Sequence, residues 1–129
     1  MKVLSINYSI IKNGLNKKFS SVFVRNSSLT LSFLDVLFRE GLICHYALLS
    51  NGQVEVFLKY YKGIPVIGNI KPISKSGRLI NFNIKDICRW KDIYSSHSAF
   101  LVLNSSKEVF SSNELKNYKV GGQVLCVIS

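Results

Sequence analysis

Three cysteines and two histidines are the residues of this chain whose side chains most readily suggest nucleophilic or metal-binding chemistry. Cys44 and His45 are adjacent, so on a strand their side chains point to opposite faces and cannot form a catalytic pair. Cys44 and Cys126 lie in apolar runs, where we expect small buried residues, whereas His45 and His97 are expected at the surface or in caps. Because Cys88 completes an odd, widely spaced set with no C-x-x-C, the sequence predicts neither a disulfide framework nor a zinc site and indicates a reducing compartment.

The seven carboxylates are scattered along the chain, and neither a P-loop nor a G-x-G-x-x-G motif is present to hold phosphates. We therefore predict that the chain is not an enzyme and has no catalytic residue, bound metal, cofactor or small-molecule substrate. A thiol-dependent hydrolase or transferase that uses one of the cysteines is the alternative from another class. Replacing all three cysteines with Ser or Ala would then abolish an activity.

Charge gives the first positive indication of function. The 129 residues include 17 Lys and Arg against 7 Asp and Glu, a formal net charge of +10 at pH 7. This balance favours a polyanionic partner, which can be DNA, RNA or an anionic membrane surface. No apolar run approaches the roughly 20 residues needed to span a bilayer, and residues 1–7 lack a signal-peptide pattern, so we expect neither a membrane-spanning nor a secreted protein. A basic adaptor for acidic proteins is a further alternative, and its binding would be insensitive to ribonuclease.

Basic residues cluster with small hydroxyl and amide side chains in expected loops, and such side chains can donate to phosphate, ribose and base edges. Each cluster also has a structural explanation, because residues 26–28 can cap a helix, residues 74–77 can form a turn, and Lys17 and Lys18 can be a solvated loop. Together with the net charge, the clusters favour RNA. The candidate RNA-binding residues are Lys12, Asn13, Lys17, Lys18, Asn26, Ser27, Ser28, Ser74, Lys75, Ser76, Arg78, Asn104, Ser105, Ser106 and Lys107.

The elements that must position these residues follow from hydrophobic periodicity. Apolar residues at 3, 6 and 10 predict a short helix that Asn13-Gly14 ends, and residues 19–25 predict a strand. Residues 26–28 cap a second helix, whose apolar stripe lies at 31, 34 and 38 and which stops at Gly41. Residues 42–49 and 53–60 flank Ser50-Asn51-Gly52, a strong hairpin signal. The first half therefore predicts helix, strand, helix and hairpin.

The second half predicts strands at 66–73, 79–84, 100–103 and 124–128, with a turn at 74–77. Ser111 and Glu114 form a capping box for a brief helix to about Tyr118, and Gly121-Gly122 turns the chain. Residues 85–98 give no clear pattern. Because residues 61–65 break the alternation, we expect an N-terminal α/β subdomain at 1–63 and a C-terminal, mainly β, RNA-binding subdomain with one short helix at 64–129, an α/β (α+β) fold class.

Composition points to the kind of gene that encodes the chain. Phe, Tyr, Met, Ile, Asn and Lys together supply 52 residues, whereas Gly, Ala, Arg and Pro together supply 16, with Ala at only two positions. The abundant types have AT-rich codons and the scarce ones GC-rich codons. We infer an AT-rich gene, as in an organellar genome or in certain free-living bacteria.

Residues 11–14, 38–43 and 54–60 are weak landmarks that gain meaning from the closing region. There, residues 103–109 (Leu-Asn-Ser-Ser-Lys-Glu-Val) and 120–126 (Val-Gly-Gly-Gln-Val-Leu-Cys) are similar to a Ser-Thr-Ser-Lys-Gly-Val loop and a Gly-Gly-Glu-Val-Leu-Cys terminus at matching spacing. Those two motifs belong to the family of small-subunit ribosomal protein eight. The chain resembles that family over nearly its whole length.

The resemblance implies a structural constituent of the small ribosomal subunit that binds the central domain of its rRNA, supports assembly and lies beside other small-subunit proteins. Asn104, Ser105 and Ser106 would reach an irregular RNA helix with Lys107 on the backbone, and residues 74–78 resemble the family's Ser-Lys-Pro-Gly-Arg turn. Taken with the inferred AT-rich gene, the resemblance implies a protein of the mitochondrial ribosome, in the matrix, encoded by the organelle. Otherwise it implies a plastid or the cytoplasm of a bacterium. A free-standing basic RNA-binding regulator or adaptor outside the ribosome is the alternative.

Four departures from the family pattern affect the expected contacts. Glu108 replaces a glycine, Ser76 replaces a proline, Leu79 stands where a second arginine is common, and residues 97–99 replace Gly-x-Gly. A carboxylate at position 108 would be repelled by phosphate unless it points away or pairs with Lys107.

Overall fold

The structure is a computed structural model that describes residues 2–75, 77–94, 99–105, 108–114 and 121–129. The described backbone forms two compact units, Met1–Gly68 (unit 1) and Asn69–Ser129 (unit 2). The fold is mixed α and β, which confirms the predicted class. The predicted division after residue 63 stays a prediction.

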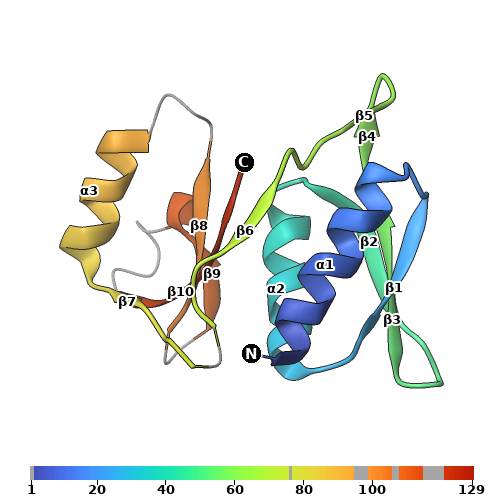
Figure 1. Ribbon diagram of the computed structural model, residues 1–129, viewed down its shortest axis with the longest axis horizontal. Coiled ribbons are helices and arrows are strands. Elements are labelled where there is room, and N and C mark those ends of the chain that lie inside the picture. Colours follow the sequence, from blue (N-terminus) through green and yellow to red (C-terminus); the bar gives the residue numbers. More distant parts are fainter. Residues whose placement is uncertain (1, 76, 95–98, 106–107, 115–120) are drawn as a thin grey trace. The chain divides into compact units, whose positions relative to one another are not determined.

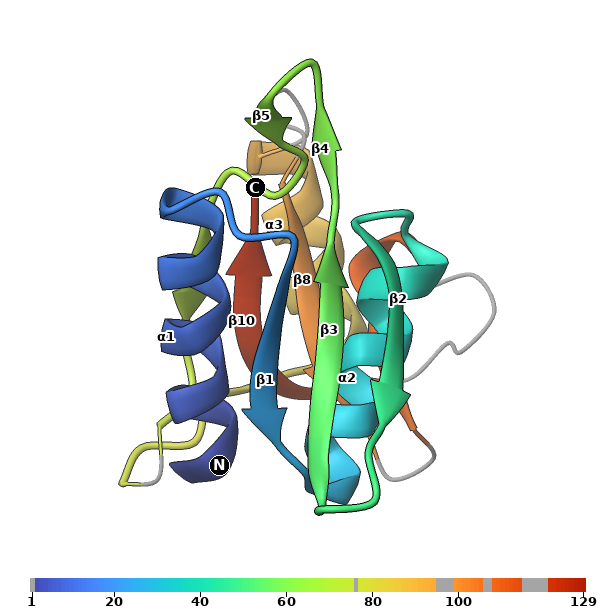
Figure 2. The same cartoon turned by 90° about the vertical axis from the view of Figure 1, so that its right-hand side faces the viewer.

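Unit 1 has two helices against a three-stranded antiparallel sheet of order β1-β3-β2, followed by a small two-stranded ribbon (Figure 1). Figure 2 shows α1 and α2 on one face of this sheet. The helix, strand, helix, hairpin order confirms the sequence prediction. The elements are α1 (Lys2–Asn16), β1 (Ser21–Arg25), α2 (Ser28–Arg39), β2 (Ile43–Leu48), β3 (Gln53–Leu58), β4 (Tyr60–Tyr61) and β5 (Ile64–Pro65).

The buried faces of both helices differ from the predicted stripes. In α1 the buried apolar residues are Leu4, Tyr8, Ile11 and Leu15, whereas Ile6 is exposed. The helix also continues past Gly14, where an added Cβ would lie 2.3 Å from Val22 Cγ1, so this glycine allows α1 to approach β1 closely. The predicted end at Asn13-Gly14 is therefore wrong.

In α2 the buried apolar residues are Phe33, Leu34, Val36 and Leu37, while Phe38 is half exposed. The predicted boundaries are close, because Ser27 is the N-cap and Gly41, at φ 74°, follows the C-cap. The error is in the buried face of the helix. The predicted stripe was 31, 34 and 38, whereas the buried face also includes Phe33 and Leu37, which lie beside that stripe.

The predicted hairpin is confirmed. β2 pairs with β3 across a turn in which Gly52 has φ 82°, and Val54, Val56 and Leu58 alternate into the core. The prediction that Cys44 is buried is wrong, because the register shifts between Ile43 and His45. Cys44 is the extra residue of this bulge and its side chain is exposed.

Unit 2 is an antiparallel sheet in which β10 is central. β8 pairs with one edge of β10 and β9 pairs with β8, while β6 and β7 pair with the other edge of β10. The strands predicted at 66–73 and 79–84 are shorter in the structure, where they cover only Ile70–Pro72 and Asn81–Phe82. The elements are β6 (Ile70–Pro72), β7 (Asn81–Phe82), α3 (Ile84–Tyr94), β8 (Phe100–Asn104), β9 (Val109–Ser111), a short 3-10 helix (Ser112–Glu114) and β10 (Gly122–Ile128).

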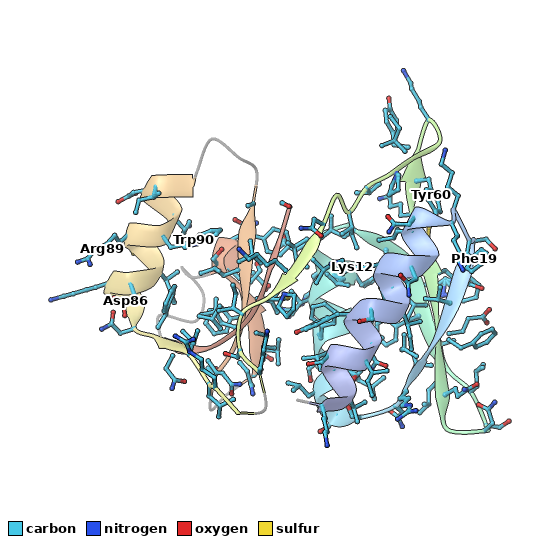
Figure 3. All side chains as sticks on the ribbon, in the orientation of Figure 1. Lys12, Phe19, Tyr60, Asp86, Arg89 and Trp90 are labelled. Carbon is cyan, nitrogen blue, oxygen red and sulfur yellow. The ribbon has the colours of Figure 1, made fainter. Side chains whose placement is uncertain are left out.

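Helix α3 is the element that the sequence patterns did not reveal. Its start is a reciprocal cap, in which the Asp86 N–H donates to Asn83 Oδ1 at 2.9 Å and the Asn83 N–H donates to Asp86 Oδ2 at 3.2 Å. Ile87 joins the buried cluster of Leu101, Leu103, Phe110 and Val124, and Trp90 packs beside it (Figure 3). An Asn-x-x-Asp pair before one apolar stripe was the missed signal.

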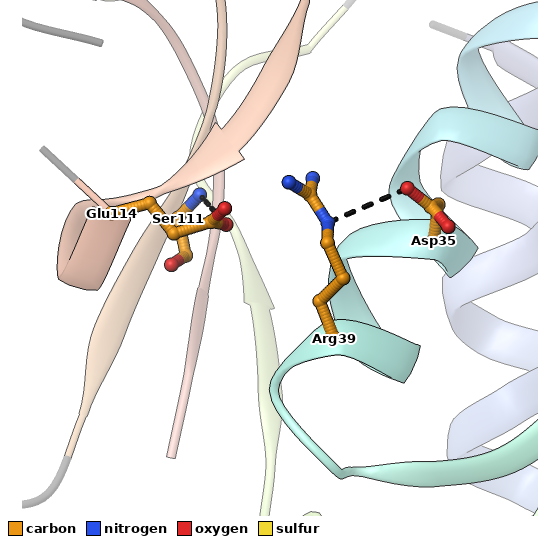
Figure 4. Close-up of polar contacts among 4 residues, drawn as sticks. All are labelled: Asp35, Arg39, Ser111 and Glu114. Carbon is orange, nitrogen blue, oxygen red and sulfur yellow. Dashed lines mark hydrogen bonds and ion pairs between the residues drawn. The ribbon is translucent and has the colours of Figure 1, made fainter. Parts of the chain in front are cut away.

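The expected capping box at Ser111 is formed in part. The Ser111 N–H donates to Glu114 Oε1 at 3.1 Å (Figure 4), and a 3-10 helix follows. The predicted continuation to Tyr118 lies outside the described residues, as does His97. None of the described helices is long and apolar enough to cross a membrane.

Candidate nucleic-acid interface

Lys17 and Lys18 lie in the exposed loop that ends α1. The Phe19 N–H donates to the Gly14 carbonyl at 2.9 Å and the Lys18 N–H to the Leu15 carbonyl at 3.2 Å, the pattern of a Schellman cap. Lys18 takes the left-handed position with φ 58°, where glycine is usual and other residues lose about 1–2 kcal/mol. The cap therefore fixes the backbone of Lys17 and Lys18 beside the C-terminus of α1, and both side chains are exposed.

Tyr60 fastens this loop to the strand that follows β3. Its hydroxyl donates to the Phe19 carbonyl at 2.6 Å and lies 3.5 Å from the Gly14 carbonyl (Figure 3). Because a hydroxyl has one proton, the shorter contact is the hydrogen bond. Burial raises the pKa of Tyr60, and burial followed by the Asp35 carboxylate raises that of Tyr46.

The substitution Tyr60→Phe is expected to lower the free energy of unfolding by about 1 kcal/mol at pH 7, since one hydrogen bond is lost. A raised phenol pKa adds stability that is fully present below the unfolded-state pKa of about 10 and is lost as pH rises through the folded-state pKa. Urea unfolding of the wild type should therefore weaken more steeply in alkali than that of Tyr60→Phe. Exposed Tyr61→Phe is the control, and parallel pH curves for wild type and Tyr60→Phe would contradict the expectation.

Asn26 and Ser27 connect β1 to α2, and Ser28 is the first residue of α2. Ser27 Oγ accepts from the Thr30 N–H at 3.1 Å and donates to Thr30 Oγ1 at 2.7 Å, so this side chain caps the helix. Asn26 and Ser28 are exposed. The connection is held from α1 by Asn7, whose buried amide donates to the Arg25 carbonyl and to Thr30 Oγ1 while its oxygen accepts from the Arg25 N–H.

The structure separates the unit 1 candidates into two places. Lys12 and Asn13 are near the C-terminal end of α1, with Lys17 and Lys18 just beyond it, whereas residues 26–28 lie beside Asn7 in its first half. Nine residues of α1, about 14 Å along its axis, separate Asn7 from the end of the helix at Asn16, so residues 26–28 and the loop of Lys17 and Lys18 are two separate places on unit 1.

Lys75 and Arg78 face each other across the predicted turn of unit 2. The N–H of each residue donates to the carbonyl of the other at 2.9 Å, and both side chains are exposed. Opposed like charges on such a pair repel each other and are relieved by an anion between them. Together with Pro72, Ile73 and Ile80, they line a groove of about 310 Å³.

Ser74 has a different position from its neighbours. Its side chain is 0% exposed, and its Oγ accepts from the Ile80 N–H at 3.0 Å and lies 3.4 Å from the Ile80 carbonyl. In this conformation Ser74 closes the base of the turn, and its contact with RNA stays a prediction. Ser76 lies outside the described residues.

The second unit 2 turn joins β8 to β9. Ser105 closes it with both backbone and side chain, because its N–H and its Oγ donate to the Glu108 carbonyl at 3.0 and 2.9 Å, and its Oγ accepts from the Glu108 N–H at 3.2 Å. Asn104 is half buried, Glu108 is exposed, and Ser106 and Lys107 lie outside the described residues.

Strand β10 brings the two unit 2 turns together. Gln123 pairs with Asn104 of β8 on one side and with Asn81 of β7 on the other. The Ile80 carbonyl accepts from the Val124 N–H at 2.8 Å, so the turn of Lys75 and Arg78 leaves the same stretch of β10. Neighbouring strands lie about 4.8 Å apart, which puts the two turns near each other at one end of the sheet.

Gly121 and Gly122 are required for this arrangement and do more than turn the chain. A Cβ on Gly121 would lie 2.3 Å from the Phe82 carbonyl oxygen, and one on Gly122 would lie 2.6 Å from that of Asn104. The glycine pair thus lets β7 and the end of β8 approach β10 from both sides. The glycine pair is visible in the sequence, but the backbone atoms that approach it belong to strands far away along the chain, so its role could not be predicted.

The cysteines and His45 differ in burial and in their neighbours. Cys44 and Cys88 are exposed, Cys126 is buried as predicted, and exposed His45 stacks on Phe57 with ring centroids 4.1 Å apart. No set of three His, Cys, Asp or Glu side chains in the described ranges is placed to hold a metal ion.

Comparisons with a family model and with individual proteins all match this chain to the same family of ribosomal proteins. The family model described as Ribosomal protein S8 matches residues 4–129. Small ribosomal subunit protein uS8m of Acanthamoeba castellanii is 32% identical over 129 residues, which is 100% of both chains. Small ribosomal subunit proteins uS8 of Brucella ovis and Brucella abortus are 34% identical over 122 residues, 92% of this chain and 89% of theirs.

Fold and surface together define a small basic α/β protein in which the exposed cations Lys17, Lys18, Lys75 and Arg78 lie at tight turns. This chain belongs to the ribosomal protein S8 family, which confirms the family predicted from the sequence. The family is a structural class of ribosomal protein and not a class of enzymes. Its members among the relatives compared are mitochondrial and bacterial.

Proposed function

We propose that this protein binds the central domain of small-subunit rRNA, chiefly through the two turns of unit 2, and thereby supports assembly of the subunit. The observation that carries the proposal is the pairing of Lys75 with Arg78 beside the Asn104–Glu108 turn. Two opposed cations suit a phosphate, and the hydroxyl and amide groups of the neighbouring turn suit ribose and base edges. Asn104, Ser105, Ser106 and Lys107 remain proposed contacts.

The unit 1 cations extend the proposed contact to a second stretch of RNA. Lys12, Lys17 and Lys18 lie near one end of α1 and are proposed to neutralise phosphates there, with Asn13 between them. Asn26 and Ser28 offer polar groups at the other place, while the Ser27 side chain is engaged as a helix cap. Neighbouring small-subunit proteins complete the proposed set of partners.

Salt dependence of RNA affinity tests the proposal. The logarithm of the association constant for a transcript of the central domain should fall with log salt, with a slope of roughly −0.7 to −0.9 per phosphate contacted. Lys75→Ala and Arg78→Ala should each weaken binding and make the slope shallower by about one contact. Lys85→Ala, an exposed lysine of α3, is the matched control. Binding that ignores salt, or equal slopes for all four proteins, would exclude this interface.

The proposed location is the mitochondrial matrix, with an organelle-encoded gene. Two observations support this proposal: the full-length similarity to a uS8m protein, and the abundance of residue types that have AT-rich codons. Recovery of the chain from purified mitochondrial ribosomes tests the location, and recovery from plastid or bacterial ribosomes alone would replace it.

A further inference from the structure

A groove runs along the free edge of β1 in unit 1. Its volume is about 450 Å³. One wall is the side of α1 that carries Ile10 and Asn13, continued by Lys17 just beyond the helix. The other wall is the chain from Phe19, labelled in Figure 3, through β1. The groove is lined by Ile10, Asn13, Gly14, Lys17, Phe19, Ser21, Val22 and Phe23.

Two phenyl rings stand half exposed at this groove. Phe19 and Phe23 are each 50% exposed, and both line the groove. The Lys17 ammonium lies 6.0 Å from the centroid of the Phe19 ring, at the outer limit of a cation–π contact. A flat apolar ring beside a cation matches a nucleotide, whose base stacks on aromatic faces and whose phosphate pairs with ammonium groups.

The backbone of β1 adds hydrogen-bonding groups along the groove. The Ser20 carbonyl accepts from the Leu58 N–H, so residues of even number turn their backbone groups toward β3. The N–H and carbonyl of Ser21 and Phe23 therefore face the opposite way, along the free edge. At the end of this edge the corresponding groups of Arg25 are already bonded to Asn7.

The charges around the groove determine how a bound nucleotide would be oriented in it. Lys17 lines the groove where α1 ends, and Lys18 follows it in the same exposed loop. On the sheet side, the Glu55 carboxylate accepts from the Ser21 hydroxyl at 2.9 Å and disfavours phosphate there. A nucleotide would thus have its phosphate toward the lysines and its base against the rings.

We propose that this groove holds unpaired nucleobases of the bound RNA, one stacked on Phe19 and one on Phe23, with the phosphate next to the base on Phe19 bound by Lys17 and Lys18. The proposal rests on the proposed RNA-binding function and adds contacts that read unpaired bases. An apolar segment of a neighbouring protein is the competing occupant. The lysines favour the nucleotide, because an apolar segment would leave their charges without an anion.

The substitution Phe19→Leu tests for stacking, because leucine keeps an apolar side chain and removes the ring. Its affinity for the central-domain transcript should fall about five- to tenfold, the lower part of the range for loss of one base–aromatic stack. The salt slope should stay unchanged, since no phosphate contact is lost. Phe19→Trp should bind at least as tightly as the wild type, and Phe23→Leu should repeat the loss.

Phe38→Leu is the matched control, because Phe38 of α2 is 49% exposed and does not line the groove. Equal affinity of wild type, Phe19→Leu and Phe23→Leu would overturn the nucleobase while leaving the salt-dependent RNA binding intact. Variants that bind the transcript normally but fail to enter small subunits would show that a protein segment occupies the groove instead, which also overturns it. A wild type that does not bind the transcript would defeat the proposed function itself, and the groove assignment with it.

Discussion

Replacing Gly122 with alanine is expected to lower the free energy of unfolding by about 3 kcal/mol. The new Cβ would lie 2.6 Å from the Asn104 carbonyl oxygen and 3.0 Å from its carbon. Those are backbone atoms of the paired strand, so no rotamer change can relieve the contact, and β8 must move away from β10. Urea unfolding measures the loss, and hydrogen exchange at Val124 and Leu103 should locate it in this pair of strands.

Gly77→Ala is the control for the Gly122 variant. An added Cβ at Gly77 meets nothing within 4 Å, so this substitution should be neutral or stabilise by up to about 1 kcal/mol through the unfolded state. Because Gly122 also holds the Asn104–Glu108 turn in place, its variant should lose RNA affinity along with stability. Equal stability of the two glycine variants would mean that β10 and β8 do not approach as closely as described.

Asn7→Leu should cost about 3 kcal/mol of unfolding free energy. The Asn7 side chain is 0% exposed and makes three hydrogen bonds, at 3.0 Å to the Arg25 carbonyl, 3.0 Å from the Arg25 N–H and 2.9 Å to Thr30 Oγ1. Leucine fills a similar volume, so the loss would come from the Arg25 backbone groups left without partners at about 1–3 kcal/mol each. Thermal and urea unfolding measure it.

An asparagine elsewhere on α1 provides the comparison for Asn7. Asn16 is the exposed last residue of the helix, and Asn16→Leu should change stability by less than about 0.5 kcal/mol. A loss at Asn7 no larger than that at Asn16 would show that the amide does not hold the connection between β1 and α2.

Local signals predicted the parts of the fold that depend on neighbours in sequence. The turn at Asn51-Gly52 and the alternation of Val54, Val56 and Leu58 gave the hairpin, and Ser27 and Gly41 gave the limits of α2. The buried faces of α1 and α2 were missed because apolar residues occur on more than one side of each helix. Only the position of the sheet decides which side is covered.

Asn7 and α3 were missed for a different reason. A buried amide beside Leu4 and Tyr8 reads as an interruption of an apolar face until its partners 18 and 23 positions away are known. Helix α3 begins with an Asn83 and Asp86 cap in place of the more familiar Ser and Glu, and its core face rests on Ile87 with Trp90 beside it.

The individual candidate residues were visible in the sequence, but their grouping was not. Lys75 and Arg78 become a pair, and approach the turn at Ser105, only through the register of β10 with β6, β7 and β8. In the same way, the groove of Phe19 and Phe23 forms only when α1 packs beside β1. Long-range pairing and packing therefore determine which cations act together.

Sedimentation of a lysate from cells that make this protein tests the central claim most directly. At moderate salt the chain should migrate with the small ribosomal subunit, and it should leave the subunit only at high salt, as expected for contacts made largely with phosphates. Ribonuclease should release it as well. A chain that stays at the top of the gradient even at low salt would contradict its assignment as a structural constituent of the small subunit.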